Sequence, residues 1–192
     1  MKIGFFGGCF NPPSCVHIDL AKKIIAEYKL DEVIFVPVGD YYKKEGLVKA
    51  SHRCNMIKLA IENEPKLKID TLTLKSKKIL YASDTFKLIK QKYNNDELFF
   101  IMGSDNFRKM PNWKNYDELM EHYNIIVIER ERKHIRKTNK NNVFEYIPEQ
   151  LQEIDSSKIR EMILKNENVE KYLNTSVYEY IKKYKLYSCE EY

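Results

Sequence analysis

The sequence predicts an α/β fold: a doubly wound parallel sheet with helices on both faces and a helical C-terminal part. Apolar, strand-like runs alternate with helical patterns along the first two thirds of the chain. Two of these runs, LFFIM at 98–102 and NIIVI at 124–128, are almost continuously apolar, as in strands buried on both faces. The last third instead has helical stretches at Ser157–Leu164 and Val177–Tyr184.

In the first half, the apolar run KIGFF predicts a strand at Lys2–Phe6. A loop follows, and then apolar side chains recur at helical spacing, at Ile18, Ala21, Ile24, Ile25 and Tyr28. A second strand is expected at Val33–Val38, where Pro37 ends the ladder. Ser51 is the expected N-cap of the next helix.

In the second half, the alternation in KIDTLTL predicts a strand at Lys68–Leu74, and a helix is expected at Ser83–Tyr93. Asp84 is a candidate cap of that helix. The remaining expected elements are a short helix at Tyr116–His122 and a short strand at Phe144–Ile147. Ser176 and Glu179 have the spacing of a capping box for the last helix.

Length and composition indicate one domain over residues 1–192. The chain is 43% hydrophobic, which is enough for a core without disulfides, and its four cysteines form no C-x-x-C pair, which argues against a zinc site. The net charge of +5 is spread among acidic residues, so we expect no nucleic-acid partner. No apolar run reaches the length of a membrane span and no signal peptide is visible, so a cytoplasmic protein is expected. The sequence leaves open whether it forms a homo-oligomer.

The loop GGCFNPPSCVH, residues 7–17, joins the first strand to the first helix. Two glycines let a ligand approach the main chain, two prolines stiffen the turn, and the helix is expected to start near His17 with its N–H groups facing the loop. These residues alone fit an ordinary turn or a phosphate-binding loop. The loop is neither a Walker A sequence nor a G-x-G-x-x-G fingerprint. Cys9 and Cys15 lie near a helix N-terminus, which suggests the hypothesis of a lowered thiol pKa.

This loop resembles the opening motif G-G-[ST]-F-[DN]-P-x-H-x-G-H of the nucleotidyltransferase superfamily. Three further segments resemble bacterial nicotinate-nucleotide adenylyltransferases: HRCNMIKLAI from His52, LFFIMGSDNFRKMPNWKNYDEL from Leu98, and IDSSKIRE from Ile154. The last of these is similar to the family signature I-S-S-T-x-I-R. The four matches come in family order and extend over nearly the whole chain.

The resemblance implies a Rossmann-like sheet forming a single nucleotidyltransferase domain at 1–192. It implies adenylyl transfer from ATP to nicotinate mononucleotide, giving deamido-NAD and pyrophosphate in NAD biosynthesis. Mg²⁺ would be bound through the ATP phosphates, without protein ligands. Two alternatives stay open. One is a different phosphate acceptor, such as nicotinamide mononucleotide, phosphopantetheine or a sugar phosphate. The other is a nucleotide-binding protein without catalysis.

The resemblance also assigns roles residue by residue. The candidate catalytic residues are His17, Ser14 and Arg160. The candidate ATP-binding residues are Gly7, Gly8, Cys9, Phe10, His17, Gly103, Asp105, Ile154, Ser156, Ser157 and Arg160. The candidate mononucleotide-binding residues are Lys44, Thr85 and Trp113, with Trp113 expected to stack on the pyridine ring.

The chain departs from the family pattern at four positions. Asn11 replaces the usual aspartate, Ser14 the first histidine and Val16 a glycine. A serine hydroxyl can still donate to a phosphate but carries no charge. Asp155 stands where a serine is usual, and a carboxylate is unfavourable beside a triphosphate unless it points away, caps the helix or meets magnesium.

Overall fold

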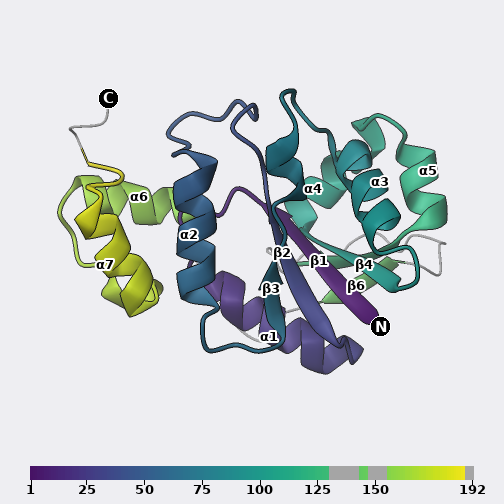
Figure 1. The fold of residues 1–192 in the computed structure, drawn as a ribbon, viewed down its shortest axis with the longest axis horizontal. Coiled ribbons are helices and arrows are strands. Elements are labelled where there is room, and N and C mark those ends of the chain that lie inside the picture. Colours follow the sequence, from purple (N-terminus) through teal and green to yellow (C-terminus); the bar gives the residue numbers. More distant parts are fainter. Residues whose placement is uncertain (130–142, 147–154, 189–192) are drawn as a thin grey trace.

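The computed structural model describes residues 1–129, 143–146 and 155–188 (Figure 1). Its centre is a six-stranded sheet in the order β3-β2-β1-β4-β5-β6, and all five neighbouring pairs are parallel. The strands are β1 (Lys2–Gly8), β2 (Glu32–Pro37), β3 (Leu67–Ile69), β4 (Glu97–Gly103), β5 (Asn124–Ile128) and β6 (Val143–Tyr146). The parallel doubly wound sheet predicted from the sequence is therefore confirmed.

The strand order reverses between β1 and β4. From β1 the chain moves outward through β2 to β3, and then returns to the other side of β1 with β4. In open sheets of this kind, ligands bind beyond the carboxyl ends of the strands at the point of reversal. Phe6 of β1 pairs with Ile101 of β4, so the loop after Gly8 and the turn after Gly103 begin side by side.

Helices cover both faces of the sheet, in two groups that Figure 1 shows on opposite sides. One core includes side chains of α1 (Cys15–Tyr28), α2 (Ala50–Ala60), α6 (Ser156–Leu164) and α7 (Thr175–Lys183). The other includes side chains of α3 (Ala82–Lys92), α4 (Ser104–Lys109) and α5 (Tyr116–His122). Three short 3₁₀ helices complete the described elements: η1 (Leu72–Lys75), η2 (Met110–Asn112) and η3 (Glu170–Tyr172).

The strands alternate between the two cores. Phe6 of β1 packs in the first core and Phe5 in the second, as expected for strands covered on both faces. Gly4 of β1 faces the first core, on the same side of the strand as Phe6. A Cβ added there would lie 2.9 Å from side-chain atoms of Leu30 and Val33 and 2.8 Å from one of Ile101. The central strand therefore needs glycine here for close packing.

The predicted strand at Lys68–Leu74 is largely wrong. The strand ends at Ile69, and η1 begins at Leu72. Asp70 is the physical reason: its Oδ1 accepts a hydrogen bond from the Leu72 N–H at 2.9 Å, which turns the chain away from the sheet. Alternating hydrophobicity did not reveal this turn.

Several helix boundaries also differ from the sequence prediction. The first helix starts at Cys15 with Ser14 as N-cap, two residues before the predicted start, and α2 is preceded by Lys49 rather than capped by Ser51. The N-cap of α7 is Asn174, whose Oδ1 accepts the Ser176 N–H, so the proposed serine capping box is wrong. The short helix α4 was not expected, whereas α5 and β5 have the predicted bounds. Residue Ile147, the predicted end of the last strand, lies outside the described residues.

No helix in the described ranges is long and apolar enough to cross a membrane.

Candidate active site

The opening loop leaves β1 at Gly8 and enters α1 at Cys15. Phe10 adopts a left-handed backbone angle, φ 48°, and its ring is buried beneath Gly8, where an added Cβ would lie 3.0 Å from the ring. Gly7 is different, because a Cβ there would meet no protein atom within 4 Å. Phe10 therefore shapes the loop from below, and the space above Gly7 is open to a ligand.

His17 lies on the first turn of α1 and is fixed by contacts on two sides. Its Nδ1 accepts a hydrogen bond from the Ser14 backbone N–H at 3.1 Å and lies 2.8 Å from the Ser14 Oγ. Its ring packs against Phe10 and Phe6, with centroids 5.4 and 6.1 Å apart. The imidazole is thus held in one orientation at the mouth of the opening loop.

The hydrogen-bond network also assigns the tautomer of this ring. A backbone N–H can only donate, so Nδ1 of His17 is an acceptor and the neutral ring carries its proton on Nε2. That proton makes Nε2 a donor suited to an anion. Ser14 is only 2% exposed, and its hydroxyl contacts the histidine. Ser14 is thus buried against the Nδ1 side of the His17 ring.

Arg53 of α2 is completely buried and connects the opening loop to the loop between β2 and α2. Its Nε donates to the carbonyl oxygen of Val48 at 2.9 Å, and its two terminal nitrogens donate to the carbonyls of Cys9 (3.0 Å) and Val38 (2.7 Å). Burial lowers the pKa of Arg53, and the three carbonyls compensate the cost of burying its charge. The contribution of Cys9 to the loop is therefore its backbone carbonyl, which accepts a hydrogen bond from Arg53.

The thiol hypothesis is wrong for Cys15. Burial, with a smaller contribution from Asp19, raises the pKa of this thiol above its usual range. The shift runs opposite to the lowered pKa expected from a position near a helix N-terminus, so burial outweighs position for this thiol.

The start of α6 lies against the opening loop from the other end of the chain. Ser156 donates its hydroxyl to the Pro12 carbonyl at 2.8 Å, and Arg160 donates to the Asn11 carbonyl at 2.8 Å. Asp155 is the N-cap of α6, and its Oδ1 accepts the N–H groups of Ser157 and Lys158. Of the three expectations for this carboxylate, helix capping is what the structure shows. Ile154 lies outside the described residues.

The C-terminal end of β4 supplies the next group of candidate residues. Gly103 is the N-cap of α4, and Asp105 is exposed in the first turn of that helix. The neighbouring Ser104 is buried and donates its hydroxyl to Glu129 Oε1 at 2.8 Å, and Arg108 donates to the same oxygen at 3.0 Å. The buried Glu129 carboxylate, paired with the exposed Arg108, therefore anchors the turn that carries Gly103 and Asp105.

The three candidate mononucleotide residues lie on separate elements. Lys44 is exposed in the loop between β2 and α2. Thr85 lies in the first turn of α3, where the Asp84 carboxylate accepts the Tyr81 N–H as expected of a cap. Trp113 follows η2 and is partly buried against the second core. Thr85 and Trp113 thus lie with the helices on the opposite face from α1 and α6.

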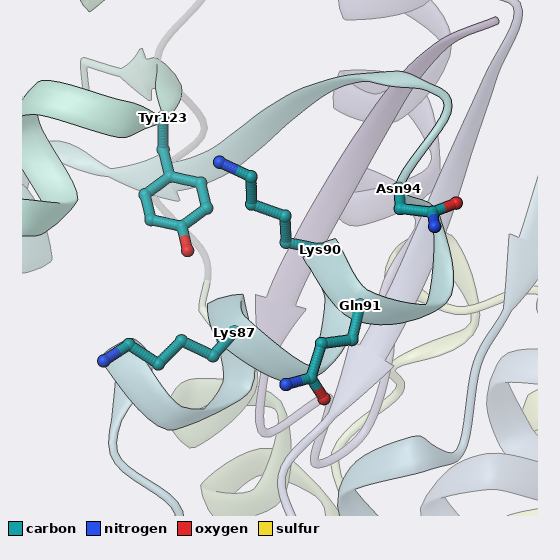
Figure 2. Close-up of a pocket in the computed structure, with 5 residues that line it drawn as sticks. All are labelled: Lys87, Lys90, Gln91, Asn94 and Tyr123. Carbon is teal, nitrogen blue, oxygen red and sulfur yellow. The ribbon is translucent and has the colours of Figure 1, made fainter.

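A separate surface pocket takes no part in this arrangement. Figure 2 shows it lined by Lys87, Lys90, Gln91, Asn94 and Tyr123. Asn94 lies between α3 and β4 and Tyr123 just before β5, so the pocket lies toward the amino ends of the strands. Among the described residues, no group of three or more His, Cys, Asp or Glu side chains could hold a metal ion.

Sequence reasoning missed two buried side chains that organise the loops. Arg53 lies within the quoted segment HRCNMIKLAI, three and four residues before Met56 and Ile57 on the apolar face of α2. An arginine at a core position of a helical pattern was the available signal. Tyr187, whose hydroxyl donates to Asn11 Oδ1 at 2.9 Å, left no such signal.

Comparison with known proteins gives one consistent result. Residues 5–162 match the cytidylyltransferase-like family. The nicotinate-nucleotide adenylyltransferase of Bacillus subtilis is 33% identical over 188 residues, which cover 97% of this chain and 98% of the relative. Two solved structures of the Plasmodium falciparum nicotinic acid mononucleotide adenylyltransferase have the same fold. The complex with NaAD has a TM-score of 0.81 at 25% identity and the complex with APC 0.80 at 26%. Both cover 97% of this chain, and this chain covers 97% and 96% of theirs.

Proposed function

Because the chain belongs to the nicotinate-nucleotide adenylyltransferase family, within the cytidylyltransferase-like proteins, we propose that it transfers the adenylyl group of ATP to nicotinate mononucleotide. A phosphate oxygen of the mononucleotide attacks the α-phosphorus of ATP. The new P–O bond completes deamido-NAD, and the bond from the α-phosphorus to the bridging oxygen breaks to release pyrophosphate. The nucleophile is already an anion at neutral pH, so the reaction needs no side-chain nucleophile.

What such an enzyme must supply is position and charge compensation. The single observation that carries the proposal is the fixed imidazole of His17 at the mouth of the opening loop. Its Nδ1 accepts from Ser14 and its ring packs on Phe10, so the proton lies on Nε2, the atom that we assign as donor to the α-phosphate as negative charge builds up there. Ser14 acts through the histidine in this proposal, rather than as a second phosphate contact.

The β- and γ-phosphates would lie between the opening loop and the start of α6. Gly7 leaves space above the main chain, and Arg160 is the cation next to that space, since its guanidinium already contacts the Asn11 carbonyl. Ser157 adds a hydroxyl donor on the same turn, whereas the Ser156 hydroxyl already donates to the Pro12 carbonyl and holds the turn against the opening loop. Mg²⁺ would be bound through the phosphate oxygens and water, and it would neutralise charge on the leaving pyrophosphate.

The adenosine would lie near Gly103 and Asp105, beyond β4, at the strand-order reversal. We assign the mononucleotide phosphate to Lys44, in the loop between β2 and α2, and its pyridine ring to Thr85 of α3 and to Trp113, which follows η2. The chain's three described cysteines are free thiols, which supports a cytoplasmic site of action.

The test measures pyrophosphate release from ATP and Mg²⁺ with nicotinate or nicotinamide mononucleotide. We expect release with the nicotinate form. The His17→Ala variant should lose at least about a hundredfold in kcat, the lower range for one charge-stabilising donor. His122→Ala, an exposed histidine at the end of α5, is the matched control and should keep wild-type activity.

Four outcomes contradict parts of the proposal. Release with nicotinamide mononucleotide alone changes the acceptor, and release with another acceptor such as phosphopantetheine changes the reaction. ATP binding without release in any acceptor panel makes the chain a non-catalytic nucleotide-binding protein. Undiminished release in His17→Ala leaves the reaction standing and removes the histidine from it.

A further inference from the structure

Asn11 is the best-connected polar side chain of the opening loop, although it is only 1% exposed. Its Nδ2 donates to the Gly46 carbonyl at 2.7 Å. Its Oδ1 accepts the Val48 N–H at 3.3 Å and the Tyr187 hydroxyl at 2.9 Å. Both polar atoms of the amide are therefore used inside the protein, and the side chain does not contribute to the open space above the loop.

Two of these partners belong to one segment, residues 38–49 between β2 and α2, which we call the acceptor loop. The acceptor loop carries the exposed Lys44. Asn11 forms hydrogen bonds with this loop two and four residues after Lys44, at Gly46 and Val48. Buried Arg53 holds the two ends of the same segment through the carbonyls of Val38 and Val48. The acceptor loop is thus fastened to the opening loop at several points.

The third partner brings in the C-terminal part of the chain. Tyr187 is 2% exposed and follows α7, 176 positions after Asn11. Its hydroxyl donates to the oxygen that also accepts from the acceptor loop. The main-chain carbonyl of Asn11 in turn accepts a hydrogen bond from Arg160. One residue therefore contacts the acceptor loop through its side chain and the start of α6 through its main chain.

We propose that Asn11 is a positioning residue that sets the distance between the two substrates by fixing the acceptor loop on the opening loop, with Tyr187 completing the joint. The inference rests on the proposed function, which assigns the mononucleotide phosphate to Lys44. The positioning role explains why position 11 carries an amide rather than a carboxylate. Nδ2 donates to a carbonyl, and the carboxylate of an aspartate would set a negative oxygen against the Gly46 oxygen instead.

The decisive variant is Asn11→Asp, which keeps the size and the Oδ1 acceptor, removes the donor to Gly46 and sets a carboxylate oxygen in its place. We expect the KM for the mononucleotide to rise about tenfold, the ratio that follows from losing one buried hydrogen bond, with the KM for ATP changed less than about twofold. Backbone amides at 44–48 should exchange with deuterium faster. Tyr187→Phe, which removes one hydroxyl, should raise the same KM by about threefold.

Tyr93→Phe is the matched control, because Tyr93 also donates a hydroxyl to a side-chain oxygen, that of Asp70, but on the other face of the sheet. It should leave both KM values unchanged. Equal rises in both KM values, or wild-type exchange at 44–48 in Asn11→Asp, would overturn the positioning role. If the wild type uses neither pyridine mononucleotide, the proposed function fails, and the exchange experiment still tests the joint.

Discussion

Replacing Arg53 with lysine tests whether one buried cation holds the two loops at the edge of the sheet. Arginine reaches three carbonyls in three directions, those of Cys9, Val38 and Val48, through three different nitrogens. Lysine keeps the charge but has a single nitrogen at the end of a flexible chain. Its three N–H donors start from that one nitrogen, so we expect them to reach one of the three separated carbonyls and to leave two without a donor.

Each buried carbonyl without a partner costs about 1–3 kcal/mol, so two cost about 2–6 kcal/mol. The ion pair with Asp40 adds little, because the oxygen lies 3.7 Å away and its side chain is exposed. For a chain of this size, roughly 3 kcal/mol corresponds to a fall in Tm of about 6–12 °C. A rise in the KM for ATP should accompany it, since the Cys9 carbonyl belongs to the opening loop.

Thermal unfolding followed by circular dichroism measures the first effect, and pyrophosphate release at varied ATP measures the second. Lys58→Arg, on the exposed side of the same helix, is the control and should unfold within about 1 °C of the wild type, as surface substitutions usually do. A wild-type Tm for Arg53→Lys would refute the reasoning, because it would mean that water or the lysine replaces all three hydrogen bonds.

Three more predictions address separate parts of the molecule. Gly8→Ala should lower stability by about 1–3 kcal/mol and slow catalysis, because its Cβ would press on the buried ring beneath the loop at 3.0 Å; an unchanged unfolding midpoint in urea would contradict this. Burial opposes the charge of Asp70, but hydrogen bonds, first from Lys92, outweigh it and hold the pKa of this carboxyl below its usual value. The resulting stability is present above the unfolded-state pKa of 3.8 and is lost as the pH falls through the lower folded-state value. The Asp70→Asn variant should therefore have a lower free energy of unfolding than the wild type at pH 7. The difference between the two free energies should shrink when unfolding is measured below about pH 4. Ser14→Ala should keep most of the activity, because the backbone N–H that fixes the histidine tautomer remains; a loss as large as in His17→Ala would give the hydroxyl a direct role.

The sequence was a good guide to the sheet and a poor one to its turns. LFFIM and NIIVI became β4 and β5 because continuous apolar runs in an alternating pattern leave few other solutions. The strand expected after Lys68 failed because the Asp70 side chain redirected the backbone, and Asn174 captured the cap expected at Ser176. Both errors come from side chain to backbone hydrogen bonds, which compete locally with periodicity and leave no periodic signal.

In the candidate site too, some residues could be proposed from the sequence and others could not. His17, Gly7 and Gly8 became candidates through the resemblance to the family's opening motif, because the loop alone fits either an ordinary turn or a phosphate-binding loop, and their roles stay predictions. The contacts that hold them could not be predicted, since Asn11 meets residues 35, 37 and 176 positions away. Such pairings depend on how the finished fold brings its loops together, and a single sequence contains no record of them.

Asp155 shows how the structure changes the meaning of an unfavourable residue. A carboxylate free to face a triphosphate would repel it, yet this one accepts two N–H groups of its own helix and so compensates the positive end of α6. The helix terminus consequently offers less attraction to an anion than a serine-capped one would. In the site proposed for the β- and γ-phosphates, side chains would therefore have to supply the binding energy, and Arg160 is the cation among the candidate residues of this turn. Its hydrogen bonds to the Asn11 and Ser156 carbonyls fix it on the loop side of the helix before any ligand arrives. In the proposed site, preorganisation of the arginine would offset the attraction for anions that the Asp155 cap removes from the helix terminus.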